Sequence, residues 1–88
     1  MQIAKVELEN LGTVNTNQVI LENKEGERVF LWFSYQTIVA FQNAYGKRFC
    51  VQNQWGPTTG KLLNKIEPNK KDRIEPEEFK KLLSLLLA

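Results

Sequence analysis

Residues 29–35 are Val29-Phe30-Leu31-Trp32-Phe33-Ser34-Tyr35, a run rich in aromatic and β-branched side chains. Successive side chains of a strand point to opposite faces, so Val29, Leu31 and Phe33 share one face while Phe30 and Trp32 share the other. Both faces are apolar, which predicts a central strand that is covered on each side, with Trp32 and Phe33 in the core. A buried helix would also hide such a run, but the residue types favour a strand.

The same alternation predicts further strands on both sides of this run. Ile3, Val6 and Leu8 alternate with charged residues, and Asn10-Leu11-Gly12 is expected to end that first strand. Gly26 is expected to supply a positive φ in the hairpin connection 23–27. A turn is also predicted at residues 43–46, and a tight turn or a bend at residues 35–36. The predicted strands cover residues 2–9, 18–22, 28–34, 37–42 and 47–54.

A short helix is predicted directly after the fifth strand. Gly56-Pro57 is expected to end the strand, and the hydroxyl of Thr58 or Thr59 is expected to cap the helix. An apolar stripe with helical spacing follows, and Pro68 ends the helix. The stripe consists of Leu62, Leu63 and Ile66.

The last predicted helix, residues 76–88, carries more leucines than one packed face needs. Pro76 suits its first turn, and Phe79, Leu82, Leu83 and Leu86 form one stripe at about 100° per residue. Leu85 widens this stripe and Leu87 lies toward the opposite side. We therefore predict a homodimer, whereas fraying of the last residues is the alternative. The expected dimer contacts are Leu83, Leu85, Leu86 and Leu87.

These elements predict a single α+β domain over residues 1–88. Its mainly antiparallel sheet has about five strands, with one short helix and a C-terminal helix packed on the sheet. The 88 residues include no histidine and one cysteine, so cysteine–histidine and serine–histidine pairs are excluded. No phosphate-binding GxxxxGK[ST] motif occurs. We expect a protein that is not an enzyme and that uses no cofactor and no metal.

The cysteine and the termini bear on the compartment. Cys50 lies between Phe49 and Val51, which predicts a buried small apolar side chain. A lone cysteine fits a reducing compartment. No apolar run approaches the roughly 20 residues of a membrane span, and the first residues do not have the pattern of a signal peptide. We expect a soluble, cytoplasmic protein.

The basic residues are concentrated in one segment. Residues 47–73 contain seven basic and two acidic residues, a net charge of +5. Such a segment can face an anion, although an ordinary solvated surface gives the same count. Trp55 is the aromatic residue whose exposure the sequence leaves open. The expected contacts to a partner or an anion are Trp55, Thr58, Thr59, Lys61, Lys65, Lys70, Lys71 and Arg73.

Two blocks of the sequence are distinctive. They are Ser34-Tyr35-Gln36-Thr37-Ile38-Val39-Ala40-Phe41 and Trp55-Gly56-Pro57-Thr58-Thr59-Gly60-Lys61. Over residues 32–66 the chain resembles a family of small uncharacterised phage proteins, which carry a serine-tyrosine-x-threonine-x-valine-alanine strand and a later threonine-threonine-serine-lysine block. Gly56 replaces the usual serine, and Leu62 stands where the family often has histidine. The resemblance implies a viral or mobile-element origin and no particular mechanism.

Two functions are compatible with these features. The first is a small viral accessory protein that binds a host or viral protein, a class that includes inhibitors of host defence. The alternative is a nucleic-acid-binding module that uses the basic segment 47–73. Retention on a DNA column as a function of salt separates the two, because phosphate contacts release counterions.

Overall fold

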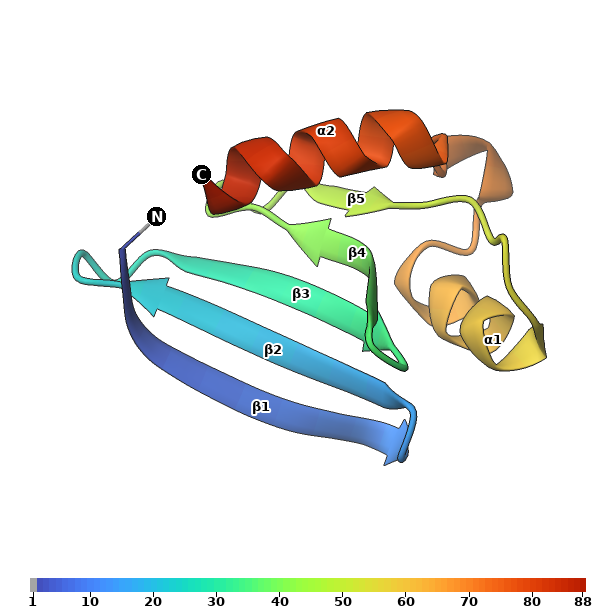
Figure 1. Ribbon diagram of the computed structural model, residues 1–88, viewed down its shortest axis with the longest axis horizontal. Coiled ribbons are helices and arrows are strands. Elements are labelled where there is room, and N and C mark those ends of the chain that lie inside the picture. The colour runs from blue at the N-terminus through green and yellow to red at the C-terminus, as the bar shows by residue number, and fades with distance from the viewer. Residues whose placement is uncertain (1) are drawn as a thin grey trace.

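The computed structural model describes residues 2–88, and Figure 1 shows their arrangement. Five strands come first along the chain and are followed by the helices. The elements are β1 (Ile3–Thr13), β2 (Thr16–Asn23), β3 (Arg28–Ser34), β4 (Thr37–Gln42), β5 (Arg48–Cys50), α1 (Pro57–Ile66), the short 3-10 helix η1 (Lys70–Asp72) and α2 (Pro76–Leu87).

The strands form one antiparallel sheet in the order β1-β2-β3-β4-β5, so each strand pairs with its neighbour along the chain. The predicted α+β fold is confirmed, and β3 is the middle strand as expected. The hairpin connections also agree with the sequence prediction, because Gly26 and Gly46 have φ values of 83° and 86°. Such values are easy for glycine and strained for other residues.

The first hairpin differs from the prediction. β1 continues to Thr13, so Asn10-Leu11-Gly12 does not end the strand, and β2 begins at Thr16. The Asn10 side chain accepts a hydrogen bond from the Gly12 amide at 3.0 Å, Gly12 has a φ of 104°, and the register shifts between Asn10 and Thr13. The turn-forming residues therefore produce a local irregularity in β1, and the pairing of β1 with β2 continues beyond it.

The fifth strand is shorter than predicted. β5 ends at Cys50, whereas the sequence pattern indicated a strand to residue 54. Beyond Cys50 the chain pairs with Ile74 in a parallel bridge, in which the Ile74 amide donates to the Cys50 carbonyl and the Gln52 amide donates to the Ile74 carbonyl, each at 2.9 Å. These backbone groups find partners in the connector before α2, which local sequence does not reveal.

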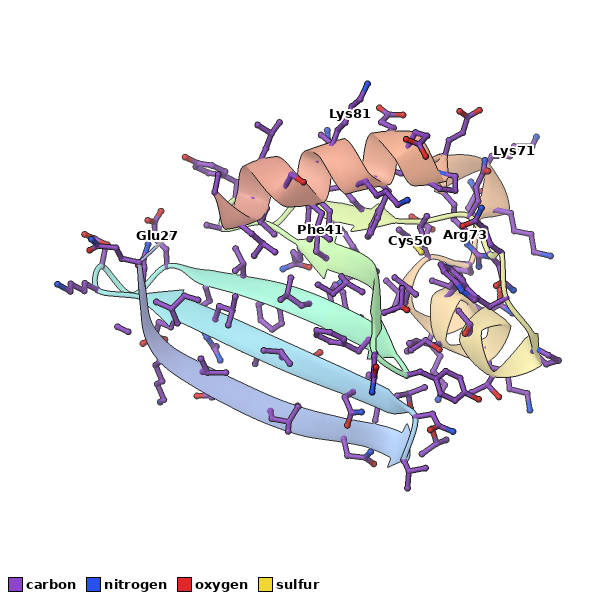
Figure 2. The ribbon with its side chains drawn as sticks, viewed as in Figure 1. Glu27, Phe41, Cys50, Lys71, Arg73 and Lys81 are labelled. Carbon is purple, nitrogen blue, oxygen red and sulfur yellow. The ribbon has the colours of Figure 1, made fainter. Side chains whose placement is uncertain are left out.

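The two helices cover opposite faces of the sheet. Phe41 pairs with Leu31 on one face, and its ring centre lies 5.4 Å from that of Phe79 on α2. Figure 2 shows Phe41 between the sheet and α2. Trp32 and Ser34 point to the other face, where α1 packs. The stripe of α1 predicted from the sequence is buried, namely Leu62, Leu63 and Ile66.

The helices leave part of the sheet uncovered. Figure 1 shows α2 running along β4 and β5, with β1 at the far edge. Val6 and Leu8 of β1 are 59% and 73% exposed. Phe33, predicted as a core residue, is only half-buried because it lines an open cleft beside Leu83. Trp32, in contrast, is 8% exposed, as the two-sided pattern predicted.

The predicted hydroxyl cap of α1 is wrong. The helix begins at Pro57, its N-cap residue is Gly56, and the cap makes no side-chain hydrogen bond within residues 2–88. Proline is favoured at the first helical position, which moves the helix start ahead of both threonines. Thr58 and Thr59 therefore lie inside the first turn, and their hydroxyls are available for other contacts.

Replacing Trp32 by alanine should lower the free energy of unfolding by about 3–5 kcal/mol, because the change opens a cavity beneath α1. It also removes the 2.8 Å hydrogen bond from the Trp32 indole to Gln18. Urea unfolding followed by circular dichroism measures the loss. Tyr45→Ala is the control, since Tyr45 is 91% exposed and its loss should change stability by about 0.5 kcal/mol or less. Equal midpoints for the two variants would contradict the packing described.

Candidate functional site

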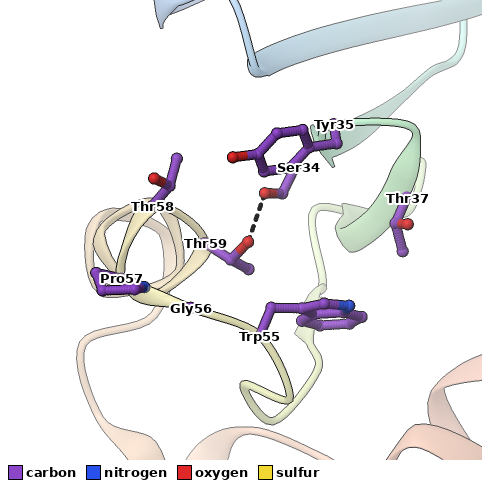
Figure 3. A pocket seen from close by; sticks show the side chains of 8 residues that line it. All are labelled: Ser34, Tyr35, Thr37, Trp55, Gly56, Pro57, Thr58 and Thr59. Atoms are coloured by element: carbon purple, nitrogen blue, oxygen red, sulfur yellow. Dashed lines mark hydrogen bonds between the residues drawn. The ribbon is translucent and has the colours of Figure 1, made fainter.

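Two segments that are distant in the sequence meet at one end of the sheet. The turn after β3 and the segment leading into α1 line a cleft of about 460 Å³. Figure 3 shows this cleft from close by. Its lining residues are Ser34, Tyr35, Thr37, Trp55, Gly56, Pro57, Thr58 and Thr59.

A buried hydrogen bond holds the floor of the cleft. The hydroxyls of Ser34 and Thr59 are 2.6 Å apart, and each residue is 3% exposed. A buried hydroxyl without a partner is costly, so each of the two residues requires the other. The bond fixes the first turn of α1 against the last residue of β3.

Tyr35 occupies an unusual backbone conformation at the rim of the cleft. Its φ is 57°, the only positive value at a residue other than glycine in residues 2–88. Two-residue hairpin turns of this kind favour glycine, asparagine or aspartate at that position, and a bulky residue there is uncommon. The Tyr35 amide donates to the Asn15 carbonyl at 2.6 Å, which ties this turn to the β1–β2 turn. The side chain is 57% exposed.

Trp55 stands on the other side of the same cleft. Its amide donates to the Asn53 side chain at 2.9 Å, and the residue is 42% exposed. In Figure 3 the rings of Tyr35 and Trp55 flank the Ser34–Thr59 hydrogen bond. The structure therefore brings three of the expected contact residues, Trp55, Thr58 and Thr59, to one cleft. Tyr35, which was not among the expected contact residues, lines the same cleft. The position of Tyr35 in a two-residue turn was the feature of the sequence that could have indicated its role.

Arg73, one of the expected contact residues, has a structural role. It is 6% exposed, and its guanidinium donates to the Glu67 carbonyl at 3.0 and 2.9 Å and to the Asn64 side chain at 2.8 Å. Figure 2 shows it beside α1. The carbonyls at a helix C-terminus need donors, and Arg73 supplies them just beyond the last turn of α1.

The four expected lysines fall into two groups. Lys61 and Lys65 line a groove of about 650 Å³ between α1 and the end of the β1–β2 hairpin. Lys70 lines a different, polar hollow with Gln52, and Lys71 is exposed on η1. Arg48, which was not among the expected contact residues, also lies in the first groove. Its position two residues before Cys50, on the strand face opposite Phe49, was the signal that could have placed it there.

The Cys50 thiol is buried inside the domain. Cys50 is 1% exposed, and burial raises the pKa of its thiol to about 11, so the thiolate is scarce at neutral pH. Within residues 2–88 no group of histidine, cysteine and carboxylate side chains could hold a metal ion. None of the described helices is both long and apolar enough to cross a membrane.

The C-terminal helix uses part of its leucine surface within the chain. Leu83 and Leu86 are half-buried against the core of the sheet. Leu85 and Leu87 are 74% and 41% exposed, as their positions outside the main stripe predicted. Because two of the four expected dimer contacts already pack on the sheet, a symmetric contact would depend most on Leu85 and Leu87. The homodimer stays a prediction.

A comparison with known protein families gives a match over most of the chain. The match is to a family described as "Family of unknown function (DUF8033)", and it covers residues 1–81. The chain belongs to this family. The match includes all five strands, α1 and the cleft, and it ends within α2. No curated protein and no solved structure matches the chain.

The pairing of Ser34 with Thr59 predicts a selective effect on stability. Thr59→Val leaves the buried Ser34 hydroxyl without a partner and should lower the free energy of unfolding by about 1–3 kcal/mol. The double variant Ser34→Ala/Thr59→Val should lose less unfolding free energy than the sum of the two single variants, because neither hydroxyl is then left unpaired. Thr58→Val is the matched control. Equal losses for Thr58→Val and Thr59→Val in urea unfolding would contradict this assignment.

Arg73→Lys should lower the free energy of unfolding by about 1–3 kcal/mol, because one ammonium cannot reproduce the geometry of the guanidinium donors. The net charge is unchanged, so any loss measures hydrogen bonding and packing. Thermal unfolding compares this variant with Lys71→Arg, a conservative change at an exposed position. An unchanged melting temperature in Arg73→Lys would show that the hydrogen bonds of the Arg73 guanidinium do not contribute to stability.

Proposed function

We propose that this protein is a small viral accessory protein without catalytic activity, which acts by binding a host or viral protein. The proposed contact surface is the cleft between Tyr35 and Trp55. The observation that carries the proposal is the left-handed backbone of Tyr35 together with the exposure of its ring.

The backbone of Tyr35 is the first support. A residue other than glycine in this conformation costs of order 1–3 kcal/mol, and such residues cluster at functional sites. Glycine would remove the strain, and the exposed ring contributes little burial to the core in return. The side chain of Tyr35 contributes little to the stability of the fold. Recognition of a partner explains why a tyrosine, and not a glycine, occupies this position.

The surroundings of the cleft are the second support. Tyrosine and tryptophan are enriched among the residues that dominate binding energy at protein interfaces. Here both rings stand over a floor that the buried Ser34–Thr59 hydrogen bond makes rigid. A preorganised surface loses less conformational entropy on binding than a flexible one. The hydroxyls of Thr37 and Thr58, which also line the cleft, can pair with the backbone of a bound segment.

The viral origin is supported by the sequence resemblance. The serine, tyrosine and threonine of the first block line the same cleft as the tryptophan and threonines of the second block. Two blocks that are separate in the sequence thus share one surface. An inhibitor of host defence is one role within this proposal, with the defence protein as the partner.

Tyr35→Gly provides the decisive test. The variant should be as stable as the wild type or more stable by about 1 kcal/mol, because relief of strain exceeds the added entropy of the unfolded chain. Its affinity for the partner should fall by about tenfold or more, since central aromatic contacts contribute about 2 kcal/mol or more. The partner is first captured from host lysate with wild-type protein, and affinities are then measured with the purified partner.

Trp55→Ala should weaken the same interaction, while Tyr45→Ala serves as the control for loss of an exposed aromatic side chain at the opposite end of β4. A partner that binds wild type, Tyr35→Gly and Trp55→Ala with equal affinity would exclude the cleft as the contact surface.

A further inference from the structure

A second concave surface lies on the α1 side of the sheet and is separate from the Tyr35–Trp55 pair. It is the groove of about 650 Å³ between α1 and the end of the β1–β2 hairpin. Helix α1 forms one wall, and the end of the first hairpin forms the other. Trp32 and Arg48 contribute the sheet side. The lining residues are Leu11, Thr13, Thr16, Trp32, Arg48, Thr58, Lys61, Leu62, Asn64, Lys65 and Ile66.

The charge of this groove is one-sided. Three cations line it, namely Arg48, Lys61 and Lys65. None of the lining residues that the structure describes is an aspartate or a glutamate. Lys61 and Lys65 are one helical turn apart, an arrangement in which like charges repel. None of the three cations forms an ion pair in the described part of the chain. The acidic residue Glu9, on the same side of β1, accepts a hydrogen bond from Gln18. An anion in the groove would relieve the repulsion.

Arg48 is held rigidly for such a contact. Its guanidinium donates to the Ile66 carbonyl at 3.1 Å and to the Gln42 side chain at 3.4 and 3.3 Å. It also lies 5.3 Å from the ring centre of Trp32, within range of a cation–π contact. The partners are neutral, so the positive charge is fixed in place and not neutralised. A fixed cation loses little conformational entropy when it binds an anion.

The rest of the lining indicates the kind of anion. Leu11, Leu62 and Ile66 give the groove an apolar portion, and the Thr13 and Thr16 hydroxyls, 2.9 Å apart, give it a polar portion. A groove of about 650 Å³ has more room than a single phosphate ion fills. Pockets that combine apolar surface with a few placed polar groups are typical of small-molecule and cofactor sites. The matching ligand carries a phosphate together with a weakly polar group that can contact the apolar residues.

We propose that this groove binds a nucleotide through its phosphate, with Lys61, Lys65 and Arg48 around the phosphate and the apolar residues against the base or sugar. The nucleotide can be free or part of a single strand, since both present the same chemistry. This surface is smaller than the basic segment 47–73 as a whole, because Arg73 is buried and Lys70 and Lys71 lie outside the groove.

Isothermal titration calorimetry with AMP and adenosine tests the requirement for phosphate, and a six-residue oligothymidylate distinguishes a strand from a free nucleotide. The groove variant is Lys61→Gln/Lys65→Gln, and the control with the same charge change is Lys70→Gln/Lys71→Gln. All four lysines are exposed, so both variants should fold, which circular dichroism verifies. Tyr35→Gly should leave nucleotide binding unchanged, which separates this site from the proposed protein contact.

We expect AMP or the oligonucleotide to bind, adenosine to bind more weakly, and the groove variant to lose about tenfold or more in affinity. Affinity should also fall when salt is raised from about 50 to about 200 mM. Absence of binding for AMP and the oligonucleotide alike would overturn the proposal. So would equal weakening in the groove and control variants, which would show attraction to net charge alone.

Discussion

Burial of both faces of β3 is the constraint on which the rest of this structure depends. An apolar strand in the middle of a sheet must be covered on each side, and here a helix of ten residues and a helix of twelve residues do the covering. Each helix must pack over a particular part of the sheet because neither is long enough to cover all of it. Helix α2 meets Phe41 on one face, and α1 meets Trp32 and Ser34 on the other.

The placement of α1 follows from a few polar contacts that supplement its apolar stripe. Ser34 and Thr59 join its first turn to the end of β3. At its C-terminal end, Arg48 donates to the Ile66 carbonyl and Arg73 donates to the Glu67 carbonyl just beyond the last turn. Both candidate surfaces border this helix. The Tyr35–Trp55 cleft lies at its N-terminal end, and the cationic groove runs along its side. The contacts that fix α1 therefore also shape the two surfaces on which the functional proposals rest.

The sequence predicted the elements whose signals are local. Alternation identified β3 and β4, Gly26 and Gly46 located two hairpin connections, and the spacing of Leu62, Leu63 and Ile66 identified the buried face of α1. The errors arose where segments that are distant in the sequence meet. Thr58 or Thr59 was expected to cap a helix, but Thr59 pairs with Ser34 of β3, and the chain beyond Cys50 forms a bridge to Ile74 that the local sequence does not predict.

The candidate site was predicted only in part for the same reason. Trp55, Thr58 and Thr59 were selected from one segment, whereas Tyr35, which completes their cleft, belongs to another. Counting charge along residues 47–73 could not separate the buried Arg73 from the exposed Lys61 and Lys65. Burial and pairing across the fold make that distinction, and composition does not contain it.

The order of the strands has a consequence for how the chain reaches this structure. Because every strand pairs with its neighbour along the chain, each pairing closes only a short loop, and such local contacts favour rapid folding. The parallel bridge between Val51 and Ile74 is different, since it must enclose the whole of α1. We therefore expect the hairpins to form early, as the chain leaves the ribosome. The bridge is expected to form later, because its two residues are separated by the whole of α1.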